Sequence, residues 1–355
     1  MKNRQYGLDI LRIMAMLLIT AIHYVAYSGV TAAPNLTDYN RVFISCISGL
    51  FVAAVNLFVL ITGYFSCEKN INFKRIFVLW VQVVALGVVL DVIGSLLLEQ
   101  PLGITTLLKT VFPISTMHYW FFTMYVLLML VSPIINILIS CLTERQHATV
   151  CIGGFLLISI LFVSNPFINS QLYVADARGI VWFVYLYIVG AGFKKYAWRL
   201  KRWKNILGVC ALYLINVVLQ FFEISSIKNC QLLDGNSVFP FALSVLLFCL
   251  FKDIDVKHKI SKWVISAFSA CSFLIYILQE HDLIRAWYWN LFDIPSYASS
   301  PYLFVGFIIS ILALWPIALI VQYLFNFVNP AIVFVYTKIE GIIKKILVKR
   351  NGGNS

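Results

Sequence analysis

Long apolar runs, separated by short polar segments, follow one another along almost the whole chain. A helix needs about 17 to 25 apolar residues to cross a bilayer, so a run of that length predicts a transmembrane span. We assign ten such runs, at residues 8–28, 42–66, 76–98, 119–140, 149–165, 179–193, 205–222, 237–251, 263–280 and 302–327. The pattern predicts an all-α, polytopic integral membrane protein with about ten transmembrane helices.

The composition agrees with this prediction. Hydrophobic residues make up 61% of the 355 residues and charged residues only 12%, and the mean hydropathy is +0.89. Soluble domains carry about 25% charged residues, so this chain must use lipid as part of its solvent. The eight cysteines form no C-x-x-C pair, and most lie within apolar runs, which predicts neither a disulfide framework nor a metal site.

The basic residues indicate the topology. If the N-terminus is cytoplasmic, the predicted inner segments hold 21 of the 27 Lys and Arg residues, and the predicted outer segments hold five. An excess of Lys and Arg is the usual signature of cytoplasmic loops. Both termini are therefore predicted to be cytoplasmic, and the net charge of +12 is explained without a nucleic-acid partner.

This division predicts two parts of unequal size. Residues 1–327 form the membrane domain, and residues 328–355 form a cytoplasmic tail. After Pro330 the tail places isoleucines at helical spacing against lysines. Such an amphipathic pattern is typical of a helix that lies on an anionic membrane surface, so we expect membrane lipid as a partner of the tail.

The first apolar run carries ionisable residues, which membrane spans rarely do. Arg12 and His23 are eleven residues apart, which places both on one helix face, about 16 Å apart along the axis. Asp9 precedes Arg12 by three residues and can pair with it. Ionisable groups at membrane depth mark a functional site by default. The structural alternative is that Arg12 reaches the lipid headgroups beside Asp9 and a neutral His23 bonds to a neighbouring helix.

Two further groups near run ends are candidates for substrate contact. Lys74 and Arg75 follow the second run, and adjacent cations suit phosphates, although they also fit inner-side topology. Trp120 begins the fourth run within an aromatic cluster, which either contacts substrate or anchors the helix at the interface.

The ninth run ends in a polar group formed by Glu280, His281 and Arg285. These side chains either bind a hydroxylated acceptor or form salt bridges with one another. No segment matches the motifs of P-loop proteins, dinucleotide-binding proteins, zinc proteases or serine hydrolases. The absence of a P-loop argues against a primary pump.

In their order along the chain, these features resemble the membrane acyltransferase-3 family, the ten-helix O-acyltransferases that modify bacterial surface polysaccharides. Arg12 and His23 match the basic residue and histidine of the family's first span. Later segments similar to family motifs lie at residues 58–64, 118–133, 185–194 and 272–285, so the resemblance runs from about residue 6 to 327. The chain departs from the family pattern at Thr62, where serine is usual, and at Val78, where the R-x-x-R motif would have another arginine.

The resemblance implies an acyl-CoA-dependent O-acetyltransferase of the bacterial plasma membrane. His23 would be catalytic, with Arg12 as its essential partner. A neutral imidazole would take the proton from a sugar hydroxyl as it attacks the thioester of acetyl-CoA, or would form an acyl-histidine that is then discharged onto the sugar. The candidate substrate-binding residues are Asp9, Lys74, Arg75, Trp120, Glu280, His281 and Arg285.

The same resemblance defines the expected substrates. Acetyl-CoA is the expected acyl donor and acts as a co-substrate, with no metal. The expected acceptor is a lipid-linked or surface glycan such as a capsule, exopolysaccharide or O-antigen-like polymer, and polysaccharide-assembly proteins are further expected partners. His23 lies about 21 Å along the helix from Asp9, so we expect transfer within or across the membrane.

Two other classes remain open at this point. A transporter or flippase for lipid-linked glycans would use the buried Arg12 and the acidic end of the ninth run to bind substrate, although the halves of the chain show no repeat. A glycan polymerase would more typically carry a large outer loop. Binding of CoA distinguishes the enzyme from the transporter.

Overall fold

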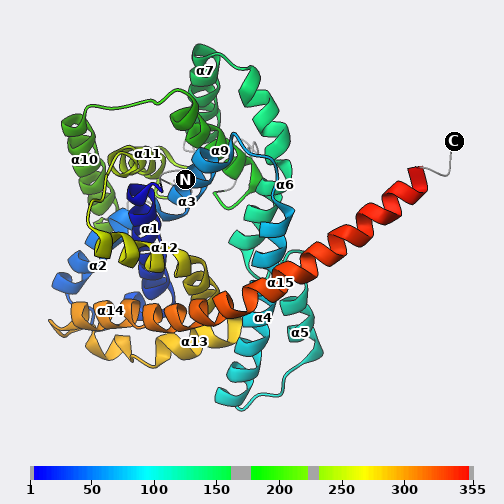
Figure 1. Ribbon diagram of the computed structural model, residues 1–355. Coiled ribbons are helices and arrows are strands. Elements are labelled where there is room, and N and C mark those ends of the chain that lie inside the picture. The colour runs from blue at the N-terminus through cyan, green and yellow to red at the C-terminus, as the bar shows by residue number, and fades with distance from the viewer. Residues whose placement is uncertain (1–3, 161–176, 223–231, 352–355) are drawn as a thin grey trace.

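The computed structural model describes residues 4–160, 177–222 and 232–351. Every regular element in these ranges is helical, as Figure 1 shows, which confirms the all-α prediction. Apolar runs fold this way because lipid offers no hydrogen-bond partner, so each span must satisfy its own backbone groups. The helices are α1 (Tyr6–Tyr27), α2 (Asp38–Phe51), α3 (Ala54–Ser66), α4 (Phe73–Leu97), α5 (Ile104–Val111), α6 (Trp120–Cys141), α7 (Glu144–Gly154), α9 (Ile180–Lys195), α10 (Arg202–Phe221), α11 (Val238–Lys252), α12 (Lys259–Glu280), α13 (Asp282–Asn290), α14 (Leu303–Leu312) and α15 (Leu314–Asn351).

Shorter elements connect these helices. Two 3-10 turns, η1 (Val30–Ala32) and η4 (Ile294–Tyr297), lie between longer helices, and the π-helical segment η2 (Phe155–Ile160) continues α7. Residues 161–165 of the predicted fifth span lie outside the described residues.

Seven helical segments of the described chain are long and apolar enough to cross a membrane. They are Tyr6–Ala32, Asp38–Ser66, Phe73–Leu97, Trp120–Cys141, Arg202–Phe221, Lys259–Glu280 and Leu303–Ile346, and the shorter α11 is also apolar. The chain is therefore a multi-pass membrane protein. The count of ten spans and the cytoplasmic position of both termini stay predictions.

Helix α1 occupies a central position, with α2, α3, α11 and α12 packed around it (Figure 1). Its contacts with α12 are the most extensive, so residues from the start and the late part of the chain meet along one seam. Leu8, Leu11 and Ala15 are fully buried in this region. Asp9, Thr20 and His23 of the same helix are buried as well, so these polar side chains lie inside the protein.

Helices α3 and α9 approach each other so closely that their backbones touch. A Cβ atom added at Gly63 would lie 2.2 Å from the carbonyl oxygen of Tyr187, and one added at Gly190 would lie 2.2 Å from the carbonyl oxygen of Leu60. Small residues facing each other are the usual means of close helix packing in membranes. This reciprocal contact joins the segments 58–64 and 185–194.

The last helix, α15, runs without a break from Leu314 to Asn351 and passes through Pro330. Its C-terminal half extends away from the other helices (Figure 1). The predicted amphipathic tail is thus the continuation of the last long helix. Ile339, Ile342 and Ile346 are exposed along it.

Candidate active site

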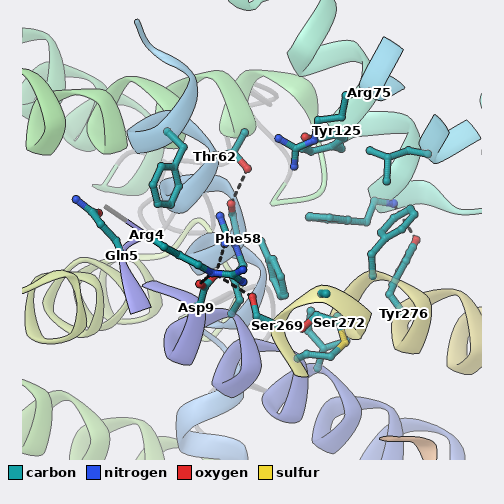
Figure 2. A pocket seen from close by; sticks show the side chains of 18 of the residues that line it. Arg4, Gln5, Asp9, Phe58, Thr62, Arg75, Tyr125, Ser269, Ser272 and Tyr276 are labelled. Carbon is teal, nitrogen blue, oxygen red and sulfur yellow. Dashed lines mark hydrogen bonds and ion pairs between the residues drawn. The ribbon is translucent and has the colours of Figure 1, made fainter. Parts of the chain in front are cut away.

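A cavity of about 530 Å³ lies between α1, α3, α4, α6 and α12 (Figure 2). Cationic side chains enter it from the start of α1, the segment after α3 and the start of α4, which together form the predicted cytoplasmic side. These are Arg4, Arg12, Lys69 and Arg75. The remaining lining is largely aromatic and aliphatic, and deeper in the cavity it includes Phe58, Phe121 and Phe273. The cavity thus combines a cationic mouth with an apolar interior.

Asp9 organises the cationic mouth, and Figure 2 shows it between Arg4 and Ser269. Its Oδ1 atom lies 2.7 Å from Nη1 of Arg12, and its Oδ2 atom lies 2.6 Å from Nε of Arg4. The Ser269 hydroxyl also donates to Oδ1, at 3.0 Å, so the carboxylate ties α1 to α12. The carboxylate is 4% exposed and has charge-assisted partners on both oxygens, which offsets the cost of its burial.

Arg12 points into the cavity and is held from two sides. Its Nη1 pairs with Asp9, and its guanidinium carbon lies 5.2 Å from the centre of the Phe65 ring. The side chain is 29% exposed, so the guanidinium keeps access to water in the cavity. An arginine fixed in this way is placed to meet an anionic group that enters from the mouth.

Of the two adjacent cations after the second span, only Arg75 lines the cavity. The Asn72 side chain caps α4 by accepting a hydrogen bond of 2.9 Å from the backbone N–H of Arg75, which fixes the first turn of the helix. Lys74 is exposed and does not line the cavity. Lys69, in the segment between α3 and α4, lines the cavity as well, and its Nζ lies 5.8 Å from the centre of the Phe65 ring.

The cavity follows one face of α1 and one face of α12. The lining residues of α1 are Asp9, Arg12, Met16 and Ile19, and those of α12 include Ser269, Ser272 and Tyr276. These positions repeat every three or four residues, as one helix face requires. The next positions on the two faces are His23 and Glu280, which lie one turn beyond the lining of the cavity.

His23 and Glu280 meet at this position. Nε2 of His23 lies 3.2 Å from Oε2 of Glu280, and each side chain is 11% exposed. Arg285 approaches the same carboxylate, with Nη1 at 3.9 Å from Oε1, and its guanidinium lies 4.5 Å from the centre of the Tyr27 ring. The structure therefore brings together three of the sequence candidates, and the contact between His23 and Glu280 joins residues that are 257 positions apart.

His281 and Trp120 lie elsewhere. His281 is fully buried on the side of α4, with Nε2 at 3.2 Å from Oδ1 of Asp91, and it does not line the cavity. Burial lowers the pKa of His281, and the Asp91 carboxylate opposes this shift. Trp120 is partly buried, and the guanidinium of Arg178 lies 5.4 Å from its ring centre. Among the described residues, no group of three His, Cys, Asp or Glu side chains is placed to hold a metal ion.

Sequence reasoning missed several residues of the cavity. Gln5 and Tyr125 line it, and so do Ser269 and Ser272 on α12. The serines had a detectable signal, because they share the 3.6-residue repeat that ends at Glu280. Tyr125 had none, because an aromatic residue inside an apolar run resembles ordinary core packing.

The described residues thus form a helical membrane protein with a buried histidine–carboxylate pair one turn beyond a cavity that is lined by cations at one end. Comparison with protein families identifies the class, because the model described as "Acyltransferase domain" matches residues 5–320. The chain belongs to the membrane acyltransferase-3 family, which confirms the resemblance drawn from its motifs. Comparison with curated proteins and with solved structures gives no match. The protein is therefore a multi-pass membrane acyltransferase.

Proposed function

We propose that this protein is an O-acetyltransferase that moves an acetyl group from acetyl-CoA to a hydroxyl of a lipid-linked or surface polysaccharide. The observation that carries the proposal is the His23–Glu280 contact of 3.2 Å, one turn beyond a cavity with a cationic mouth. The mouth suits the phosphates of CoA, and the interior suits an acyl-bearing arm. The host membrane would be the plasma membrane of a bacterium.

The donor side is supported by charge and shape. Arg12 of α1, Lys69 of the segment after α3 and Arg75 of α4 converge on the mouth, where they can share the charge of several phosphate oxygens. The arm of CoA is then directed along the α1 and α12 faces towards His23. Lys74, although adjacent in sequence, does not line the cavity and has no role in this proposal.

The chemistry at the far end requires a base that is held in orientation. Nε2 of His23 lies 3.2 Å from Oε2 of Glu280, so a ring proton placed on Nε2 would face the carboxylate and Nδ1 would keep its lone pair. As the acceptor oxygen attacks the thioester carbonyl, a C–O bond forms and the C–S bond breaks. His23 takes the hydroxyl proton on Nδ1 and returns it to the departing CoA sulfur, while Glu280 stabilises the intermediate imidazolium.

Arg285 and the outer end of α1 form the acceptor side of the proposal. The Arg285 guanidinium contacts Glu280 and Tyr27, and its side chain is 28% exposed. A planar guanidinium and an aromatic ring together suit the hydroxyls and the apolar face of a sugar.

The test is NMR of surface polysaccharide from cells that carry the wild-type gene, a deletion, or single variants at matched protein level. We expect O-acetyl signals to disappear in the deletion and in His23→Gln, and to fall by about 100-fold or more in Glu280→Gln, because positioned acid–base catalysis contributes about 10²- to 10⁴-fold. His147→Gln is the matched control, since His147 is also buried but contacts the carbonyl of Ile188 at 2.9 Å, away from this pair.

Three results would overturn parts of the proposal. Full acetylation in His23→Gln would remove His23 from the chemistry. Equal losses in His23→Gln and His147→Gln would indicate a folding defect. Loss of the polysaccharide itself in the deletion would favour a flippase for lipid-linked glycans.

A further inference from the structure

The cavity stops short of His23 behind a cluster of three rings, those of Phe58, Phe121 and Tyr276. All three line the cavity. The centre of the Phe121 ring lies 6.0 Å from that of Phe58 and 5.7 Å from that of Tyr276, both in edge-to-face geometry. Tyr276 and Ile19 are the last lining residues on α12 and α1, and each precedes a member of the His23–Glu280 pair by four residues.

This ring cluster is held in place from behind. The backbone N–H of Phe121 donates a hydrogen bond of 3.1 Å to the Tyr276 hydroxyl, which joins the start of α6 to α12. The Phe121 ring also packs on Phe183, whose side chain is fully buried, at 5.7 Å between ring centres. Tyr276 is 4% exposed, and the partly buried rings of Phe58 and Phe121 border the cavity, so a longer group must displace rings that already pack on one another.

We propose that the ring cluster, together with Ile19, selects the acyl group by size and admits two-carbon groups in preference to longer ones. This inference rests on the proposed function, because it concerns an acyl-CoA whose thioester must reach His23. A group that enters from the mouth has to pass Phe121 and Ile19 to make that contact. Each added methylene must then displace packed aromatic atoms, and one methylene in a tight apolar site changes selectivity by roughly 10- to 200-fold.

The cationic mouth does not contribute to this selection. Arg12 and Arg75 meet the CoA part, which is the same for all acyl groups. Discrimination among acyl chains is therefore assigned to residues at the closed end of the cavity, and Phe121 is the key position because its ring contacts both of the other rings.

The test uses membrane vesicles from cells that make the natural acceptor, with the gene deleted and then restored as wild type or variant. The probes are acetyl-, propionyl- and butyryl-CoA carrying a labelled acyl group, and the readout is label in the glycan fraction. We expect wild-type transfer to fall steeply from two to four carbons. In Phe121→Ala, the ratio of butyryl to acetyl transfer should rise at least tenfold.

Ile19→Ala and Phe121→Leu should raise the same ratio by smaller factors, and they keep the test decisive if Phe121→Ala is not produced. Leu79→Ala is the matched control, since Leu79 lines the cavity one turn from Arg75, at the mouth, and its loss should leave the ratio unchanged. Equal use of all three donors by the wild type, or an unchanged ratio in all closed-end variants, would overturn the inference while leaving the proposed function in place. Absence of transfer from any donor in the wild type would instead contradict the proposed function.

Discussion

The backbone contact between α3 and α9 leads to a prediction about Gly63 that can be worked out from the structure. In Gly63→Ala, the new Cβ would lie 2.2 Å from the carbonyl oxygen of Tyr187, whereas ordinary contact begins at 3.4 Å. The obstacle is helix backbone, which cannot turn away as a flexible side chain would. Overpacking of a close-packed interior costs about 1 to 3 kcal/mol, and this contact belongs at the upper end of that range. Alanine regains about 1 kcal/mol of helix propensity over glycine, so we expect a net loss of stability of about 2 kcal/mol.

The measurement is thermal unfolding of the purified protein in detergent, with Gly153→Ala as the matched control. Gly153 is also a helical glycine, but a Cβ there would meet no heavy atom within 4 Å. It should therefore keep the unfolding midpoint or raise it, while Gly63→Ala lowers it. In the double variant Gly63→Ala with Gly190→Ala, the loss should be smaller than the sum of the single losses, because one separation of the helices relieves both clashes. An unfolding midpoint of Gly63→Ala at or above that of the wild type would refute the reasoning.

Two further predictions concern charge. Arg75→Ala should raise the KM for acetyl-CoA by about tenfold with a smaller change in kcat, as expected for loss of one charged contact of about 1.4 kcal/mol. Lys74→Ala should leave the KM unchanged, because Lys74 does not line the cavity. Equal effects of the two substitutions would contradict the placement of Arg75, and not Lys74, in the cavity. Burial lowers the pKa of His147 from its usual 6.5, so the folded state resists protonation and stability should be lost as the pH falls below that value. The thermal unfolding midpoint should be measured at pH 7 and at pH 5, which lie on either side of about 6.5. Between these two pH values the midpoint should fall less in His147→Gln than in the wild type. An equal fall in both proteins would show that another group causes the loss of stability at low pH.

Patterns within one helix could be predicted from the sequence, because their geometry is local. The pairing of Asp9 with Arg12 and the common face of Arg12 and His23 both follow from 3.6 residues per turn, and the structure contains both. The difference between Lys74 and Arg75 has the same origin, since neighbouring residues on a helix point about 100° apart. The sequence alone does not show how α4 is rotated about its own axis, so it could not predict which of the two cations faces the cavity.

Contacts between distant helices could not be predicted in this way. Nothing in the chain indicates that the end of α12 lies beside α1, so the partner of His23 was not apparent from the residues near it. His281 shows a related limit. It stands between α12 and α13 with φ of −63° and ψ of 125°, outside helical geometry. Glu280 and His281, although adjacent, therefore face different neighbours, and only the first meets His23.

The packing of α1 against α12 fixes the distance between the cationic mouth, where the proposed acyl donor would bind, and His23 at the other end. At the inner end Ser269 donates to Asp9 at 3.0 Å, and at the far end Glu280 lies 3.2 Å from His23. Both helices run in the same direction between these contacts, and the cavity occupies the space along them. The fourteen residues from Asp9 to His23 rise about 21 Å. This distance is set by the helix backbone and by interhelical contacts at both ends, so the length that the donor must span is fixed before it binds. In this proposal, the side chains of the ring cluster around Phe121 are the part of the path that must move when the acyl group enters.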